Sequence, residues 1–271
     1  MRIRVGCEFQ YDATGYTPTV WQVRPRAEPM QRLVLESWGT SPPLPWSSYH
    51  DAYGNVCVRL TLPPGPVLLR YDAQVEVPGI ADDSDKEAYQ VPVESLPDEA
   101  MAFLLPSRFC LSDVLQQRAW DLFGGTQPGW PRVAAVCDWV HDNVQFVVGS
   151  SNPLTSALHV WDSRAGVCRD FAHLGLTLCR SLNIPARYVF GYLPDIGIPP
   201  PYAPMDFCAW FEAYLGGRWW TFDPRNNERR IGRVVIGRGR DALDVAMVTT
   251  YGAPILQTMT VWADEIGDQA T

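Results

Sequence analysis

Hydrophobic and polar residues alternate with a period of two through most of the first hundred residues, which is the pattern of strands with one buried face. Turn-forming stretches such as Thr40-Ser41-Pro42-Pro43 and Ala52-Tyr53-Gly54-Asn55 interrupt the alternation. The predicted strands are Ile3–Tyr11, Thr19–Pro25, Gln31–Trp38, Val56–Leu62 and Val67–Val77. We therefore expect residues 1–106 to form an N-terminal antiparallel β-domain.

After residue 106 the apolar positions recur at steps of three and four, the period of α-helices. Capping residues, proline and glycine mark where these helices begin and end. The predicted helices run from Ser112 or Asp113 through Leu122, from Pro131 to about Asn143, from Thr155 or Ser156 through Asp162, and from Phe171 to Leu182. The last is predicted to be amphipathic, with an apolar stripe on a core.

Beyond the last helix the period of two returns. The predicted strands are Ala186–Tyr192, Phe207–Leu215, Arg218–Phe222, Arg233–Ile236 and a last one near Ile255–Trp262. We expect them to complete a second domain, residues 107–271, in which helices pack on an antiparallel sheet. The predicted fold class is therefore α+β.

A glycine turn, Ala165-Gly166-Val167, places Cys168 in the first turn of the most apolar predicted helix. Unpaired N–H groups and the positive end of the helix dipole favour thiolate over thiol at such a position. The same N–H groups can hold an oxyanion formed when the thiolate attacks a carbonyl. Taken alone, a cysteine at a helix start is also well explained as a small buried residue.

Composition narrows the classes of protein. A net charge of −8 and no basic stretch that stands out exclude a general nucleic-acid binder. No apolar run reaches membrane length, and Met1-Arg2-Ile3-Arg4-Val5-Gly6 lacks the apolar block of a signal peptide, so we expect a soluble cytoplasmic protein that binds no membrane. The seven cysteines are odd in number and form no CxxC pair, which suits a reducing compartment. We expect no cofactor.

Three ordered motifs carry a family resemblance over essentially the whole chain. They are Gly166-Val167-Cys168-Arg169-Asp170-Phe171-Ala172, Ala209-Trp210-Phe211-Glu212 and Trp220-Thr221-Phe222-Asp223-Pro224. The chain resembles the bacterial transglutaminase-like family of the papain-like cysteine protease and transglutaminase superfamily. The resemblance implies a nucleophilic cysteine, a histidine directly before Ala-Trp as general base, and an aspartate that orients this histidine.

The cysteine of this triad maps to Cys168 and the aspartate to Asp223, but the histidine position holds Cys208. None of the four histidines is expected to substitute. His173 lies about 140° round the helix from Cys168 and points away, and His159 and His50 lie on other elements. The predicted catalytic residues are therefore Cys168, Cys208 and Asp223, although an aspartate before proline also commonly caps a turn.

This atypical triad leaves several functions open. The first is a thiol enzyme that acts on an amide, ester or thioester carbonyl of a peptide or small molecule, by hydrolysis or acyl transfer to an amine. The second is a two-thiol acid/base catalyst of isomerisation, cyclisation or addition. Two thiolates and a carboxylate also suit zinc with an open position, and a binding pseudoenzyme is the fourth possibility. We favour the thiol enzyme and predict no metal; the oligomeric state stays open.

Two further segments have weaker interpretations. The proline-rich loop Pro194–Met205 follows a predicted strand close to the site and is either a substrate entrance or a connector. The arginines of Arg225–Arg230 and Arg238–Arg240 form a basic patch, either for an anionic part of a substrate or as a solvated face.

Overall fold

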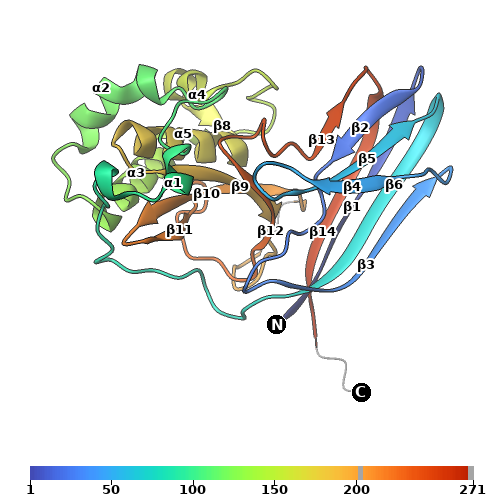
Figure 1. Ribbon diagram of the computed structural model, residues 1–271, viewed down its shortest axis with the longest axis horizontal. Coiled ribbons are helices and arrows are strands. Elements are labelled where there is room, and N and C mark those ends of the chain that lie inside the picture. The colour runs from blue at the N-terminus through green and yellow to red at the C-terminus, as the bar shows by residue number, and fades with distance from the viewer. Residues whose placement is uncertain (201–203, 268–271) are drawn as a thin grey trace.

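The computed structural model describes residues 1–200 and 204–267. Two sheets of an all-β region lie at one end of the molecule and the helices lie at the other, with a third sheet between them (Figure 1). The predicted α+β fold class is confirmed. Among these described residues no helix is long and apolar enough to cross a membrane.

The all-β region consists of two four-stranded antiparallel sheets, ordered β14-β1-β6-β3 and β13-β2-β5-β4. Its strands are β1 (Arg2–Ala13), β2 (Thr17–Trp21), β3 (Arg32–Ser41), β4 (Ser47–His50), β5 (Val56–Leu62), β6 (Gly65–Glu76), β13 (Val248–Thr250) and β14 (Ile255–Ile266). Alternate residues of β1 and β6 are buried between the sheets, as the period of two predicts. The five predicted N-terminal strands are all present; β4 was not predicted.

The last predicted strand exists, but it lies in a different sheet from the one expected. Strand β14 pairs with β1 along its whole length, from Arg2 opposite Ile266 to Asp12 opposite Ile255. Strand β13 likewise pairs with β2. The expectation that the C-terminal strand completes the sheet of the second domain is therefore wrong. Periodicity cannot reveal this, because it predicts a strand without identifying its partner.

The helical region packs against a four-stranded antiparallel sheet of order β11-β10-β9-β12. The helices are a short 3-10 turn (Val93–Ser95), α1 (Asp98–Met101), α2 (Ser112–Phe123), α3 (Trp130–Asn143), α4 (Ala157–Ser163) and α5 (Cys168–Ser181). The strands are β9 (Ala186–Tyr192), β10 (Cys208–Leu215), β11 (Arg218–Phe222) and β12 (Val234–Gly239), together with a two-residue parallel pair, β7 (Gln145–Phe146) and β8 (Ala165–Gly166).

Helix α5 lies at the centre of this region and is buried on all sides from Asp170 to Ser181. It contacts α2, α3 and α4 as well as β9 and β10. A side chain at Gly175 would lie 2.7 Å from the ring of Phe211, so this glycine lets helix and sheet approach closely. The predicted amphipathic helix packed on a core is confirmed, but its polar side is buried as well. Its polar residues are buried with partners, as when Arg180 donates to the carbonyl oxygens of Ala186 and Arg240 at 2.9 and 2.6 Å.

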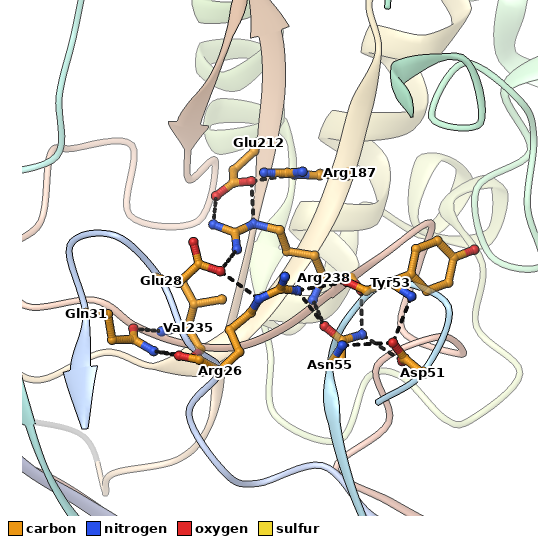
Figure 2. A network of polar contacts seen from close by, with 10 residues as sticks. All are labelled: Arg26, Glu28, Gln31, Asp51, Tyr53, Asn55, Arg187, Glu212, Val235 and Arg238. Carbon is orange, nitrogen blue, oxygen red and sulfur yellow. Dashed lines mark hydrogen bonds and ion pairs between the residues drawn. The ribbon is translucent and has the colours of Figure 1, made fainter. Parts of the chain in front are cut away.

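A buried polar network joins the all-β region to the central sheet (Figure 2). Arg238 on β12 donates to both carboxylate oxygens of Glu212 on β10 at 2.8 Å, and Arg187 on β9 donates to one of them at 2.6 Å. From the all-β side, Glu28 pairs with Arg238, and Asn55 accepts from the Arg238 backbone N–H at 2.8 Å. Arg238 is thus a structural ion-pair residue. The prediction that it belongs to an exposed basic patch is wrong.

Candidate functional site

The turn before α5 fixes where Cys168 lies. Strands β7 and β8 pair directly before it, and the carboxylate of Asp170 accepts a hydrogen bond from the Val167 backbone N–H at 2.8 Å. A side chain at Gly166 would lie 2.6 Å from Cβ of Asp170, so only glycine leaves room for this buried carboxylate. The helix therefore begins at Cys168, whose backbone N–H has no acceptor one turn earlier in the helix.

The structure brings Cys168 and Cys208 together. The Cys168 thiol lies 3.9 Å from the carbonyl oxygen of Phe207, the residue directly before Cys208. Both cysteines belong to one apolar cluster with Val189 and Trp210, and both line the same cavity. Cys168 is half-buried, whereas Cys208 is 5% exposed.

The two thiols differ in acidity. Interaction with the Cys208 thiol lowers the pKa of Cys168, helped by the Ala209 backbone N–H and by the charge of Arg225, against the opposing effect of burial. The same interaction raises the pKa of Cys208 well above its ordinary value, and burial and the Cys168 charge add to this. When the pair loses a proton, that proton therefore comes from Cys168, and Cys208 keeps its own.

Cys168 differs in this respect from the other cysteines of the chain. Burial raises the pKa of each of the five cysteines outside the site, namely Cys7, Cys57, Cys110, Cys137 and Cys179. Cys168 is the one cysteine of seven whose pKa is lowered. A thiol with a lowered pKa that faces a cavity has the character of a reactive thiol.

Asp223 lies directly after β11 and is held by two neighbours. Its carboxylate accepts from the Asn226 side chain at 2.7 Å and from Arg233 at 2.9 Å. The negative charge of Asp223 contributes to the raised pKa of Cys208. Asp223 thus acts on Cys208 through charge, and its side chain anchors an arginine.

Arg233, on the approach to β12, is a residue that the sequence did not single out. Its buried guanidinium bridges Asp223 and Asp82 at 2.9 and 2.8 Å and lies 4.7 Å from the centre of the Trp210 ring. Its positive charge lowers the pKa of Cys208 and so opposes the other influences there. A buried carboxylate such as that of Asp223 needs a cationic partner. The arginines that follow Asp223 in the sequence could therefore have been considered as its partners.

Three of the four histidines are held by other parts of the structure, whereas the fourth, His141, has its Nδ1 atom 3.2 and 3.1 Å from the carbonyl oxygens of Pro224 and Arg225, directly after Asp223. His173 is fully buried, accepts from the Ala242 backbone N–H at 3.1 Å and stacks on Phe109. Burial lowers its pKa well below the ordinary value. His159 accepts from the Ser156 backbone N–H at the start of its own helix, and His50 lies on β4 of the all-β region.

A cavity of about 550 Å³ opens beside the two thiols. Polar residues in its wall include Tyr188, Asp206 and Arg169, and the charge of Cys168 contributes to a raised pKa of Tyr188 that is mainly due to burial. Asp206 belongs to the segment that follows the predicted entrance loop Pro194–Met205, of which residues 201–203 lie outside the described part of the chain.

The structure does not favour the zinc alternative. Within residues 1–200 and 204–267, no three His, Cys, Asp or Glu side chains are arranged as a metal site. The carboxylate of Asp223, the acidic residue of that alternative, is already engaged by Asn226 and Arg233.

Comparisons with known proteins agree with this architecture. A family model of the transglutaminase-like superfamily matches residues 116–224. The crystal structure of a candidate cysteine protease from Cytophaga hutchinsonii is 35% identical, with a TM-score of 0.90 over 100% of this chain and 92% of that one.

Two mycobacterial relatives are uncharacterised. A protein of Mycobacterium leprae is 36% identical over 118 residues, so the match spans 42% of each chain. A protein of Mycobacterium tuberculosis is 28% identical over 246 residues, which cover 82% of this chain and 77% of the relative. The fold, the matched core and the identity to the Cytophaga protein along the whole chain establish that this protein belongs to the transglutaminase-like superfamily.

Proposed function

We propose that this protein is a thiol enzyme that attacks an amide, ester or thioester carbonyl through Cys168 and passes the acyl group to water or an amine. The observation that carries the proposal is that the one acidified cysteine of the chain lies at a helix start and faces a cavity. The Cytophaga relative, a candidate cysteine protease, supports the same class of chemistry.

In the first step the Cys168 thiolate attacks the carbonyl carbon, and the carbonyl oxygen becomes an oxyanion. The N–H groups at the start of α5 are suitable donors to this oxyanion. The tetrahedral intermediate then expels its amine, alcohol or thiol, which takes a proton from the Cys208 thiol. The products are a thioester on Cys168, a protonated leaving group and a thiolate on Cys208.

The acidity of Cys208 changes in the direction that this step needs. Cys168 raises the pKa of Cys208 in two ways, through the interaction between the two sulfur groups and through its negative charge. Both effects disappear once Cys168 carries an acyl group. Burial and the charge of Asp223 remain and still raise the pKa of Cys208, while the charge of Arg233 remains and lowers it. In the second step the Cys208 thiolate takes the proton of the attacking water or amine, and the Cys168 thiolate leaves.

The experiment is to trap the acyl intermediate. Protein mixed with p-nitrophenyl acetate should gain the mass of one acetyl group, and peptide mapping should locate that group on Cys168. The matched control, Cys168→Ala, should gain none. Acetylation spread over other residues, or a Cys168 that stays free while ester is consumed, would refute acyl transfer through this residue.

The pKa difference between the thiols also suits the second hypothesis, a two-thiol acid/base catalyst in which Cys168 is the base and Cys208 the acid. The trapping experiment separates the two. Rapid alkylation of Cys168 by iodoacetamide combined with no acylation by any ester or amide would favour acid/base chemistry. If Cys168 is alkylated no faster than Cys57, neither enzyme hypothesis holds and a binding role is favoured.

A further inference from the structure

The cavity beside the thiols is mostly apolar. Apart from the two cysteines and a few polar groups, its wall consists of apolar side chains and backbone. The large apolar residues are Phe109, Val167, Phe190, Phe207, Leu243, Val245, Met247, Val248 and Met259. A volume of about 550 Å³ is in the range of pockets that enclose small organic ligands. An acyl group bound to Cys168 therefore meets a surface that favours hydrocarbon over charge.

The charged residues of the wall are engaged by the protein. Arg169 donates to the Asn152 carbonyl oxygen at 3.0 Å and to the Ser151 hydroxyl at 3.2 Å. Asp206 accepts from the backbone N–H of Phe207 at 2.7 Å. These groups thus have partners, and an ionic part of a substrate would have to compete for them.

Exposed apolar side chains flank the residues that line the cavity. Leu243, in the wall itself, is 60% exposed. Val148 and Leu154 are 83% and 66% exposed and bracket Gly149–Pro153, of which Gly149, Ser151, Asn152 and Pro153 line the cavity. Exposed large apolar side chains in and next to the segments that line a pocket are typical of a surface that an apolar ligand covers.

The all-β region supplies part of this wall. Val248 belongs to β13, which pairs with β2, and Met259 belongs to β14, where it lies opposite Phe9 of β1. The loop before β13 is tied to the same region, because the Gln22 backbone N–H donates to the Met247 carbonyl oxygen at 3.0 Å. The pairing of the C-terminal strands thus places an all-β surface opposite the catalytic helix.

We infer that the acyl donor of this enzyme carries an apolar acyl group, an alkyl chain or aromatic ring, and that β13 and β14 of the all-β region help to select it. The inference rests on the proposed function for the role of Cys168. The pocket selects the acyl group, and Cys168 attacks the carbonyl of the substrate that is bound there.

A binding measurement tests the inference without turnover. Cys168→Ala protein is titrated calorimetrically with octanamide and with acetamide, which differ in chain length and share the reacting amide. Each buried methylene is worth about fourfold in affinity, so with partial burial we expect octanamide to bind at least about a hundredfold more tightly. Equal affinities, or no binding of octanamide at its solubility limit, would overturn the inference.

Two pairs of variants in the same Cys168→Ala background locate the binding. Met259→Gln should weaken octanamide binding about tenfold, whereas Met259→Leu, of similar volume and polarity to methionine, should leave it nearly unchanged. Leu243→Gln and Leu243→Met form the second pair, at an exposed position where folding is not at risk. Octanamide affinity that is unchanged in both Gln variants would show that the chain binds elsewhere and overturn the assignment.

The two proposals fail separately. If wild-type protein forms the acetyl-Cys168 adduct but octanamide binds no better than acetamide, the proposed function stands and the apolar pocket does not. If octanamide binds through Met259 and Leu243 but Cys168 is never acylated by acetyl or octanoyl esters, the pocket stands and acyl transfer does not.

Discussion

Strand β10 carries two buried ionisable groups whose surroundings differ. At its first residue, Cys208 lies in an apolar cluster with Cys168 and faces a cavity. Further along, Glu212 has both carboxylate oxygens bound by Arg238 and one of them also by Arg187 (Figure 2). Burial alone would raise the pKa of Glu212, but the two arginines outweigh it and lower the pKa to about 2.

The difference separates the part of the sheet that carries a structural network from the part at which we propose the chemistry. The Glu212 network joins strands β9, β10 and β12 to Glu28 of the all-β region, and each charge has a partner of opposite sign. The thiols of Cys168 and Cys208 interact, their pKa values shift in opposite directions, and both line a cavity. A satisfied buried network holds the regions together, and an incompletely compensated pair next to a cavity is free to react.

The largest effect should be the loss of activity on substitution of Cys168. Cys168→Ser should lower kcat/KM for ester substrates by about a thousandfold or more, because serine is not ionised in this pair. Its melting temperature should change little, since the two side chains are nearly the same size. Cys57→Ser, in β5 of the all-β region, is the matched control and should keep its activity. Equal activity in both variants would contradict the proposed nucleophile.

The second effect should be a loss of stability on substitution of Glu212 in the ion-pair network. Glu212→Gln should lower the free energy of unfolding by about 3 kcal/mol, since it leaves buried arginines without their carboxylate. Glu8→Gln makes the same change in a pair with Arg70, whose side chains are 46% and 27% exposed for Arg70 and Glu8, and should cost at most about 1 kcal/mol. Urea unfolding measures both. Similar losses would mean that the network is not structural.

The stability that the Glu212 network contributes should depend on pH. The folded-state pKa of Glu212 lies below its ordinary value, so the stability that this carboxylate contributes is present above about 4.5 and is lost as the pH falls towards about 2. In Glu212→Gln protein this part of the pH dependence should be missing. Parallel stability curves for wild type and variant across this range would contradict the assignment.

Substitution of Cys208 should have a smaller effect on the rate than substitution of Cys168. Cys208→Ser should lower kcat by about a hundredfold, since a hydroxyl is a poor relay for the proton that the leaving group needs. The variant should also move the alkylation of Cys168 to higher pH, because the Cys208 thiol is the main influence that lowers the pKa of Cys168. Iodoacetamide labelling across pH measures this shift. An unchanged profile would mean that the sulfurs do not interact.

The smallest effect concerns wild-type protein alone. At neutral pH iodoacetamide should label Cys168 faster than Cys57, because the pKa of Cys168 is lowered and that of Cys57 is raised by burial. Labelling of Cys168 should fall only when the pH drops through its lowered pKa. Denatured protein is the control, and in it the two rates should converge.

Most of the local structure could be predicted from the sequence. The period of residues 3–11 identified β1, and the glycine turn before Cys168 identified where α5 begins, because these features depend on neighbours in the chain. The motifs with Cys168, Cys208 and Asp223 also identified the superfamily. The catalytic roles of these three residues stay predictions.

What the sequence missed depends on contacts between distant segments. Arg233 was taken only as the first residue of a strand, and its position between Asp82 and Asp223 follows from the packing of the central sheet. Arg238 was taken for a surface residue because its partner Glu28 is more than two hundred residues away in the chain. Electrostatic pairing at such separations has no local pattern.

The sequence by itself determined most of the elements, the order of the motifs and the position of a cysteine at a helix start, because side-chain period and turn chemistry are local. Only the tertiary structure decided that the final strand returns to β1, that two thiols meet and shift each other's pKa in opposite directions, and that an apolar cavity lies beside them. The physical reason is that burial, charge pairing and cavity shape are properties of surfaces that meet only after the chain has folded.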